Sequence, residues 1–372
     1  MKRMLRTIAL IIALGLMLGV CRAEDQQSKT LDIYFLDMAG GASTLIVTPL
    51  GESVLIDTGS LEPKHRDVDR ICRACADAGV KQIDYLITTH FHSDHYGGIL
   101  ELSNRIPIRR FMDKGALPPQ REQNREQFKQ LYARYKEATK GDVTAVRAGD
   151  DIPLKNDPAG RVPAIKLHCV ASEKKIEGFD GDIDAPVEGF EMKKPDETDN
   201  ARSIALVLTY GKFKFFAGGD ITWNVEHHLA HPTNRIGKVD LYQVTHHGLD
   251  QSNNPILLKA LSPTACVAMN GPTKGIQPNT FKALNALPSI GRFERLTVKD
   301  GKLVGRTLLA GIYQIHYNTQ YGDEGNPDPD FIANSKEDPD KGQYIRTSVH
   351  PEKNTFTISI GPEGTKRTFS IR

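Results

Sequence analysis

Three histidines and one aspartate fall within six consecutive positions of the chain, at His90, His92, Asp94 and His95. They follow the apolar run at residues 85–87, which predicts a strand that ends just before them. Imidazole and carboxylate are groups that zinc and similar divalent cations prefer, and a loop that leaves a strand can turn alternate side chains toward one point. The cluster therefore predicts a metal site; the alternative is a polar loop whose histidines only cap the strand.

Three more apolar runs end in residues that suit such a site. These ends carry, in chain order, Asp57, Asp220, and the pair His246 and His247. Each has an ordinary structural explanation when taken alone, since Asp-Gly turns and capped strand ends are common. We expect Asp57 to hold the metal loop from behind.

Taken together, Asp57, the cluster at residues 90–95, Asp220 and His246 resemble the metallo-β-lactamase superfamily over residues 31–290. The resemblance implies an α/β fold, a four-layer αββα sandwich, with two divalent metal ions at the sheet edge. Zn²⁺ is the first expectation for these ions and Mn²⁺ is the alternative. We also expect a small β extension at the C-terminal end.

One branch of the superfamily, the hydrolase domain of competence-type DNA-uptake proteins, is similar at residues 31–37, at Gly219-Asp220 with Glu226, and at residues 246–248 with Ser252. The chain departs from that branch at residues 39–42, where Ala and Gly replace a Gln and an Asp, and at Gln277, where a histidine is usual. We therefore expect the metal centre to be kept and the substrate contacts to differ.

The resemblance implies a ligand for each metal position. His90 and His92 would bind the first metal, Asp94 and His95 the second, Asp220 both, and His246 would complete the second site. Most members supply a third first-site histidine where Asp199 stands here, so Asp199 is expected to replace it. A carboxylate there would weaken zinc or favour manganese. Alternatively, Asn200 with Ser203 resembles the competence branch, which lacks this histidine.

The implied activity is hydrolysis by a water that two metal ions activate. Asp94 and Asp220 are the candidates for orienting that water and moving its proton, and His247 is the candidate for protonating the leaving group, with a merely packed histidine as the alternative. Phosphate diesters, as small molecules or within nucleic acid, are the expected substrates. Acyl compounds (a lactone, lactam or thioester) and a metal-binding module without activity remain alternatives, and a diiron flavoprotein, which has a glutamate in place of His92, ranks last.

The N-terminus predicts export. A basic start, an apolar run at residues 8–20 and the small Ala23 are typical of a cleavable signal peptide at residues 1–23, after which no stable membrane partner is expected. Lipidation of Cys21 is the alternative. Cleavage would remove four of the 48 basic residues and none of the 46 acidic ones, leaving a formal charge of −2. The secreted or periplasmic protein would thus have no overall positive field for nucleic acid. Its oligomeric state stays open.

Apolar runs of strand type alternate with helical patterns along residues 24–290, which are expected to form the hydrolase domain, and residues 291–372 are expected to form a separate β-rich extension. The charged segment at residues 121–139 places apolar side chains at helical spacing. It predicts an amphipathic helix that either leans over the site or only packs on the sheet. Cys72 and Cys75 follow helical spacing in another segment and are interpreted as packed thiols, with a redox pair as the alternative.

Overall fold

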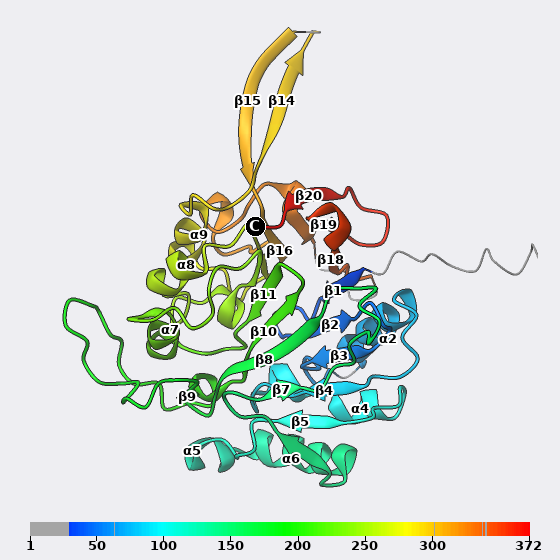
Figure 1. The fold of residues 1–372 in the computed structure, drawn as a ribbon, viewed down its shortest axis with the longest axis vertical. Coiled ribbons are helices and arrows are strands. Elements are labelled where there is room, and N and C mark those ends of the chain that lie inside the picture. Colours follow the sequence, from blue (N-terminus) through cyan, green and yellow to red (C-terminus); the bar gives the residue numbers. More distant parts are fainter. Residues whose placement is uncertain (1–29, 63, 301, 337, 339–340) are drawn as a thin grey trace, which may run out of the picture.

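Two large sheets pack face to face and helices cover their outer faces (Figure 1). The computed structural model describes residues 30–372 except positions 63, 301, 337, 339 and 340. The predicted signal peptide at residues 1–23 lies outside the described residues.

The first sheet joins the N-terminal strands to the last strands of the chain. Its spatial order is β20 (Arg367–Ser370), β19 (Thr355–Ile360), β18 (Ile345–His350), β1 (Leu31–Phe35), β2 (Thr44–Val47), β3 (Ser53–Ile56), β4 (Tyr85–Ile87), β5 (Phe111–Asp113) and β6 (Val143–Ala145). Strands β3 to β6 run parallel, so their carboxyl ends meet at one edge of the sheet.

The second sheet contains the strands of the second half. Its spatial order is β17 (Ile332–Asn334), β16 (Ile312–His316), β13 (Ala265–Ala268), β12 (Leu241–Gln243), β11 (Phe213–Ala217), β10 (Ala205–Tyr210), β8 (Ile165–Ser172) and β7 (Asp151–Ile152), with β9 (Lys175–Ile176) paired to β8. A separate two-stranded ribbon consists of β14 (Arg292–Lys299) and β15 (Lys302–Ala310). Strands β11, β12, β13 and β16 are parallel neighbours.

Helices form the two outer layers. Over the first sheet lie α2 (Arg66–Asp77), α4 (Ile99–Ser103) and α6 (Glu126–Thr139), and over the second lie α7 (Trp223–Ala230), α8 (Pro255–Leu261) and α9 (Pro278–Asn285). Shorter pieces are α3 (Ser93–Tyr96), α5 (Gln120–Gln123) and the 3₁₀ turns η2 (Asn200–Arg202), η3 (Thr245–Gly248), η4 (Gly322–Glu324), η5 (Pro329–Phe331) and η6 (Pro351–Lys353).

Alternating side chains divide each strand between two cores. In β1, Ile33 and Phe35 belong to the core between the sheets, whereas Tyr34 belongs to the core under the first helical layer. In β11, Phe215 and Phe216 divide in the same way between the inner core and the second helical layer. This period of two confirms the predicted four-layer αββα sandwich.

The predicted amphipathic helix exists as α5 and α6. On α6, Phe128, Tyr132 and Tyr135 surround the ring of Phe91, which lies inside the histidine cluster, at centroid distances of 6.5, 5.8 and 5.2 Å. The helix thus packs directly against the loop that carries the chemistry, and its aromatic face fixes that loop in place.

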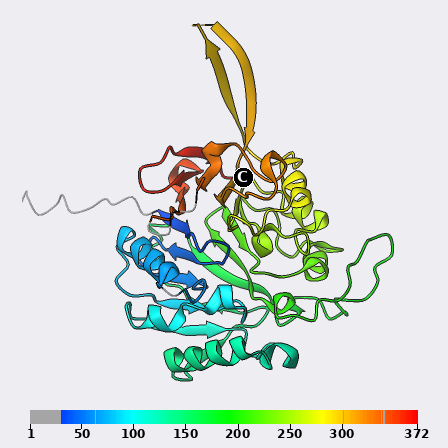
Figure 2. The ribbon, with the colours of Figure 1, turned by 180° about the vertical axis from the view of Figure 1, so that it is seen from behind.

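The C-terminal strands do not form a separate extension. Strand β18 pairs with β1 and extends the first sheet, while β16 pairs with β13 and extends the second. The predicted domain boundary at residue 290 therefore does not match the strand pairing. Strands β18 and β16 supply hydrogen-bond partners for β1 and β13, whose backbone groups would otherwise lie at exposed sheet edges. The ribbon of β14 and β15 projects from the body in both views (Figures 1 and 2).

The four described cysteines are free thiols: Cys75, Cys169 and Cys266 are buried and Cys72 is half-buried. Cys72 and Cys75 lie on α2, as the helical spacing predicts, and Cys75 belongs to the core beneath that helix. Among the described residues, no helix has the length and apolar character that crossing a membrane requires.

Candidate metal centre

Three loops at the carboxyl ends of parallel strands bring the candidate residues together. Strand β4 leads into the histidine cluster, β11 leads through two glycines to Asp220, and β12 leads into η3 with His246 and His247. Because the two sheets face each other, the loops from the first sheet meet those from the second at one edge of the sandwich. The candidates converge there although they are far apart in the sequence.

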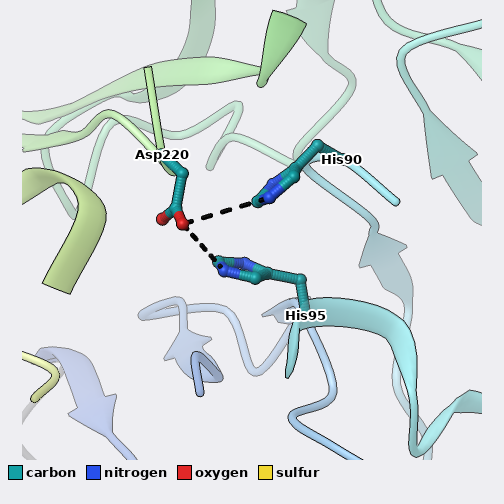
Figure 3. Close-up of side chains that lie close together, drawn as sticks. All are labelled: His90, His95 and Asp220. Carbon is teal, nitrogen blue, oxygen red and sulfur yellow. Dashed lines mark ion pairs between the residues drawn. The ribbon is translucent and has the colours of Figure 1, made fainter. Parts of the chain in front are cut away.

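The carboxylate of Asp220 lies at the middle of the cluster. Its Oδ2 atom is 3.2 Å from Nε2 of His95, 3.4 Å from Nε2 of His247, 3.5 Å from Nε2 of His246 and 4.0 Å from Nε2 of His90. Figure 3 shows the imidazoles of His90 and His95 pointing toward this carboxylate from the β4 side of the site. One oxygen therefore stands among four imidazole nitrogens.

Three of these nitrogens have no hydrogen-bond partner. The Nε2 atoms of His90, His95 and His247 are buried and, among the described residues, approach carboxylates without forming a hydrogen bond. Leaving a buried polar atom unpaired costs about 1–3 kcal/mol, so three at one place need a common explanation. Lone pairs that converge on a carboxylate are the donor set of a divalent cation, so these residues fit the metal that the sequence predicts.

The side chains group into two overlapping sets with the spacing of metal ligands. One set is His90, His95 and Asp220, and the other is Asp94, His95 and His247. In the second set, Oδ2 of Asp94 is 3.3 Å from Nε2 of His247 and 3.7 Å from Nε2 of His95. The two sets share His95, so the site can hold two cations side by side.

Hydrogen bonds from behind orient the ligand rings. The Nδ1 atom of His95 is 2.8 Å from Oδ2 of Asp57, which also accepts from the hydroxyl of Thr89 at 2.8 Å. The Nδ1 atom of His247 is 2.9 Å from the carbonyl oxygen of Met269. Such contacts fix which nitrogen faces the metal, and they confirm the expected role of Asp57.

His92 differs from its neighbours because it already has a partner. Its Nε2 atom is 3.2 Å from Oε1 of Glu122 on α5, and its side chain is 25 % exposed. Burial lowers the pKa of His92, but the hydrogen bond and charge of Glu122 outweigh burial and raise it. The ring lies 4.7 Å from that of His90, at the edge of the cluster. The structure therefore places the predicted ligand His92 beside the site, paired with a carboxylate.

Asp199 does not join the centre, contrary to the prediction that it replaces a histidine ligand. Its Oδ1 atom is 3.1 Å from the ammonium of Lys114, and its Oδ2 atom accepts from the backbone N–H of Phe91 at 2.7 Å. Both oxygens are thus engaged, and the residue is fully buried. Asp199 fixes the backbone of the histidine loop through Phe91 and acts as a structural anchor.

His246 and His247 both lie at the site, and their contacts differ from those that the sequence predicts. His247, the predicted acid, places its Nε2 atom in the ligand-spaced set. His246, the predicted ligand, reaches Asp220 but also has Nε2 3.3 Å from the amide of Asn200 and Nδ1 3.2 Å from the hydroxyl of Ser252. Both residues have left-handed backbone, with φ of 53° and 55°, which turns the second ring back into the site.

The charges at the centre suit cation binding. Burial lowers the pKa of His90 well below its usual value, which keeps the imidazole neutral and its lone pair available. Burial raises the pKa of Asp220, but His95 and the neighbouring imidazoles outweigh this and lower it well below the usual value. Burial lowers the pKa of His95, but the charges of the Asp220, Asp57 and Asp94 carboxylates outweigh burial and raise it well above its usual value. The carboxylates that raise the pKa of His95 thus attract positive charge to this buried site, and a bound cation would supply that charge in place of the proton.

Two polar residues at the site, Lys274 and Glu122, were not predicted from the sequence. Lys274 follows β13 and donates from Nζ to Oδ2 of Asp94 and to the carbonyl of Gly40. Its loop packs tightly on the site, since a Cβ atom on Gly275 would lie 2.2 Å from the carbonyl oxygen of His247. Glu122 comes from the charged helical segment. Only Lys274 could have been found, because it follows the end of the next parallel strand.

The centre opens toward the α5–α6 segment. A cavity of about 190 Å³ there is lined by His92, Asp94, Glu122, Arg125 and Phe128, among others. A substrate entering along this side would pass the exposed guanidinium of Arg125 before it reached Asp94. The expected position of the helix over the site is therefore consistent with access to the metal centre.

An αββα sandwich with paired His and Asp ligands at its edge is the architecture of metal-dependent hydrolases. The chain belongs to the metallo-beta-lactamase superfamily, whose family model matches residues 37–265. Members of this superfamily are generally metal-dependent hydrolases, and the metal they bind is commonly zinc. No curated protein matches the chain.

Several solved structures are similar in fold. A Parabacteroides distasonis protein, described provisionally as a metal-dependent hydrolase, is 14% identical over 70% of this chain and 90% of its own, with a TM-score of 0.39. MEM-A1, a subclass B3 metallo-beta-lactamase from a soil metagenome library, is 13% identical over 64% and 76%, with a TM-score of 0.33. A Cronobacter sakazakii metallo-beta-lactamase with a HARLDQ motif is 14% identical over 49% and 53%, with a TM-score of 0.29.

Proposed function

We propose that this protein is a hydrolase that uses two divalent cations to cleave phosphate diesters. The observation that carries the proposal is the convergence of three buried, unpaired imidazole nitrogens on the carboxylates of Asp94 and Asp220. When bound, a pair of cations lowers the pKa of a water molecule toward neutrality and neutralises charge on the reacting oxygens.

The chain's own residues prepare the site for that chemistry. Asp220 lies within reach of every ligand ring, where its carboxylate can accept a hydrogen bond from a water molecule and hold it against the substrate. Asp94 stands on the side of the cavity and can take up the proton. The Nε2 atom of His247 faces both carboxylates, so we assign it to metal binding and not to protonation of the leaving group.

Cationic groups beside the site favour an anionic substrate. Lys274 contacts Asp94 directly and its side chain is 38% exposed, and Arg125 lines the cavity from the opposite segment. A phosphate diester carries one negative charge and gains more as its phosphorus is attacked, so two flanking cations stabilise it more than a neutral ester. The similarity of residues 246–248 and Ser252 to competence-type hydrolases supports nucleic acid as one such diester.

The test uses the chain from Glu24, stripped of metal and reloaded with zinc or manganese. It should hydrolyse bis(p-nitrophenyl) phosphate, and Asp220→Asn should lower kcat by at least about 100-fold. Asp142→Ala, an exposed aspartate outside the site, is the matched control. Turnover of nitrocefin or a lactone without turnover of the phosphate would favour acyl hydrolysis, and bound metal without any turnover would favour a binding module.

Lys274→Gln separates the substrate classes further. The variant should raise KM for the anionic diester about tenfold and leave KM for an uncharged lactone unchanged, because only the diester needs the ammonium charge. Equal effects on both substrates would contradict the proposed role of Lys274 in recognising charge.

We further propose that the protein is exported, as a secreted or periplasmic hydrolase. The support is the N-terminal pattern at residues 1–23 alone. Amino-terminal sequencing of the protein recovered outside the cytoplasm should begin at Glu24. A lipidated N-terminus at Cys21 would show the alternative route.

A further inference from the structure

The ribbon of β14 and β15 gathers most of the exposed apolar side chains of the described residues. Five of the nine large hydrophobic residues that are exposed lie on it: Leu296, Val298, Leu303, Val304 and Leu308, with exposed fractions from 49 to 66%. The ribbon projects clear of both sheets in opposite views (Figures 1 and 2). Apolar side chains concentrated in this way mark an interaction surface.

The strand register places four of these side chains on one face. Leu296 and Val298 alternate with Thr297, and Val298 is directly opposite Leu303 in the register. Leu308 lies opposite Glu294, which belongs to the same alternation. Directly opposed residues of antiparallel strands share a face. The ribbon therefore has one face that is apolar toward the tip, with an ion pair between Arg306 and Glu294 at 3.3 Å and with Arg292 at the base.

Contacts at the base of the ribbon fix it to the body and set the direction in which it projects. Phe293 packs edge-on against Phe369 at a centroid distance of 5.0 Å. The guanidinium of Arg295 binds the carboxylate of Asp328 through two hydrogen bonds of 2.6 and 2.8 Å. The far half has no such contacts among the described residues and is left exposed.

Charge distinguishes the ribbon from the rest of the chain. Residues 292–310 contain five basic and two acidic side chains, a net charge of +3, whereas the chain from Glu24 has −2 overall. Lys299 and Lys302 face each other across the tip, are exposed, and form no ion pair with the described residues. Cationic side chains next to exposed aliphatic ones are the combination that binds anionic lipid surfaces.

A second copy of the chain is a poorer occupant. The remaining exposed large hydrophobic residues, Leu50, Leu61, Leu117 and Phe190, lie on four separate segments and offer no matching patch. Two ribbons packed face to face would cover only about 260 Å² each, from strands of ~26 Å and a width of ~10 Å, and a stable interface needs ~800 Å² per partner.

We propose that the ribbon docks the protein on an anionic lipid surface. Val298, Leu303 and Val304 enter the headgroup region while Lys299 and Lys302 contact lipid phosphates. The metal centre lies in the body, built from β4, β11 and β12, so docking leaves it free to act on substrates near the membrane. The proposal does not depend on which substrate the centre cleaves.

The test is sedimentation of the chain from Glu24 with vesicles. This form lacks the apolar N-terminal run and keeps every described residue. In low salt, it should bind vesicles of phosphatidylcholine mixed with phosphatidylglycerol. It should not bind vesicles that contain only phosphatidylcholine. The double variant Lys299→Gln/Lys302→Gln should weaken binding roughly 30-fold, from the contribution of two basic residues near an anionic surface.

The double variant Val298→Asp/Leu303→Asp should abolish binding, and its circular dichroism and hydrolytic activity should match the wild type, since both residues are exposed and distant from the centre. Lys129→Gln/Lys140→Gln, on α6 and at the residue that follows it, and Leu61→Ser are matched controls that should bind as the wild type does. Failure of the wild type to bind mixed vesicles, or controls as damaging as the ribbon variants, would overturn the proposal. So would a dimer in light scattering that Val298→Asp/Leu303→Asp dissociates, because a second copy would then cover the face.

Discussion

Glu226 provides a test of the folded structure through the pH dependence of stability. It lies in the first turn of α7, is fully buried, and accepts a hydrogen bond at 2.7 Å from the backbone N–H of Asn254. Its other oxygen has no partner among the described residues. Burial raises the pKa of Glu226 from 4.5 to about 7, with Lys193 and Tyr242 as the charged or titratable neighbours that interact with it.

The direction in which stability changes with pH follows from how many protons Glu226 binds in the folded and unfolded states. Between pH 4.5 and 7 the folded protein keeps a proton on Glu226 that the unfolded chain has released, so its contribution to the free energy of unfolding falls as the pH rises. The two pKa values correspond to a loss of about 3 kcal/mol, complete above pH 7. Full burial means that solvent screening does not reduce this figure.

Glu226→Gln removes the titration and keeps an oxygen that can accept from Asn254. Relative to the wild type, we expect its free energy of unfolding to rise by about 3 kcal/mol between pH 4.5 and 7.5. Urea unfolding of both proteins, in the same chelator to remove metal effects, measures this difference, with Glu137→Gln on the exposed face of α6 as the control. A difference between Glu226→Gln and wild type that is constant with pH would refute the reasoning.

Three further predictions concern the metal centre. Asp57→Asn removes one acceptor behind His95 and should weaken metal binding about 10- to 100-fold in a chelator competition titration, and an unchanged affinity would contradict its role in orienting that ring. His247→Ala should lower the metal content measured by atomic absorption from two ions per chain toward one, whereas His246→Ala should keep two, and the reverse result would restore the roles expected from the sequence. Asp199→Ala should keep both ions but lower the free energy of unfolding by about 3 kcal/mol, because buried Lys114 loses a partner, and a loss of metal at unchanged stability would show that Asp199 is a ligand after all.

The layers of this fold could be predicted because their signals are local. The apolar runs that end in Asp57, His90 and Asp220 became β3, β4 and β11, and strand ends of this kind meet at a sheet edge whatever the remaining sequence is. The partners of the C-terminal strands could not be predicted, because β18 pairs with β1 across almost the whole chain. Pairing at such separation depends on complementary sheet edges, which no short pattern records.

Within the site, residue type was easier to predict than residue partner. His90, His95, Asp94 and Asp220 are brought together as expected, since few other groups are available at those strand ends. Asp199 also occupies a buried position beside the histidine loop, yet it forms an ion pair with Lys114, which lies in the loop after β5. A carboxylate acts as a metal ligand only if no nearer cation neutralises it, and the position of that cation is a property of the folded chain.

The approach of both His246 and His247 to Asp220 follows from two dihedral angles. On an ordinary extended strand end, neighbouring side chains point to opposite sides, so only one of the two imidazoles would face Asp220. Left-handed backbone at both residues bends η3 so sharply that both Nε2 atoms come within 3.5 Å of the same carboxylate oxygen. The two rings differ in their other contacts: Nε2 of His246 is shared with the amide of Asn200, whereas Nε2 of His247 faces only the carboxylates of Asp94 and Asp220. Asn200→Ala should therefore free His246 to bind at the second metal position. The double variant His247→Ala/Asn200→Ala should then bind metal more tightly than His247→Ala. Equal affinities would show that the amide of Asn200 does not restrain the His246 ring.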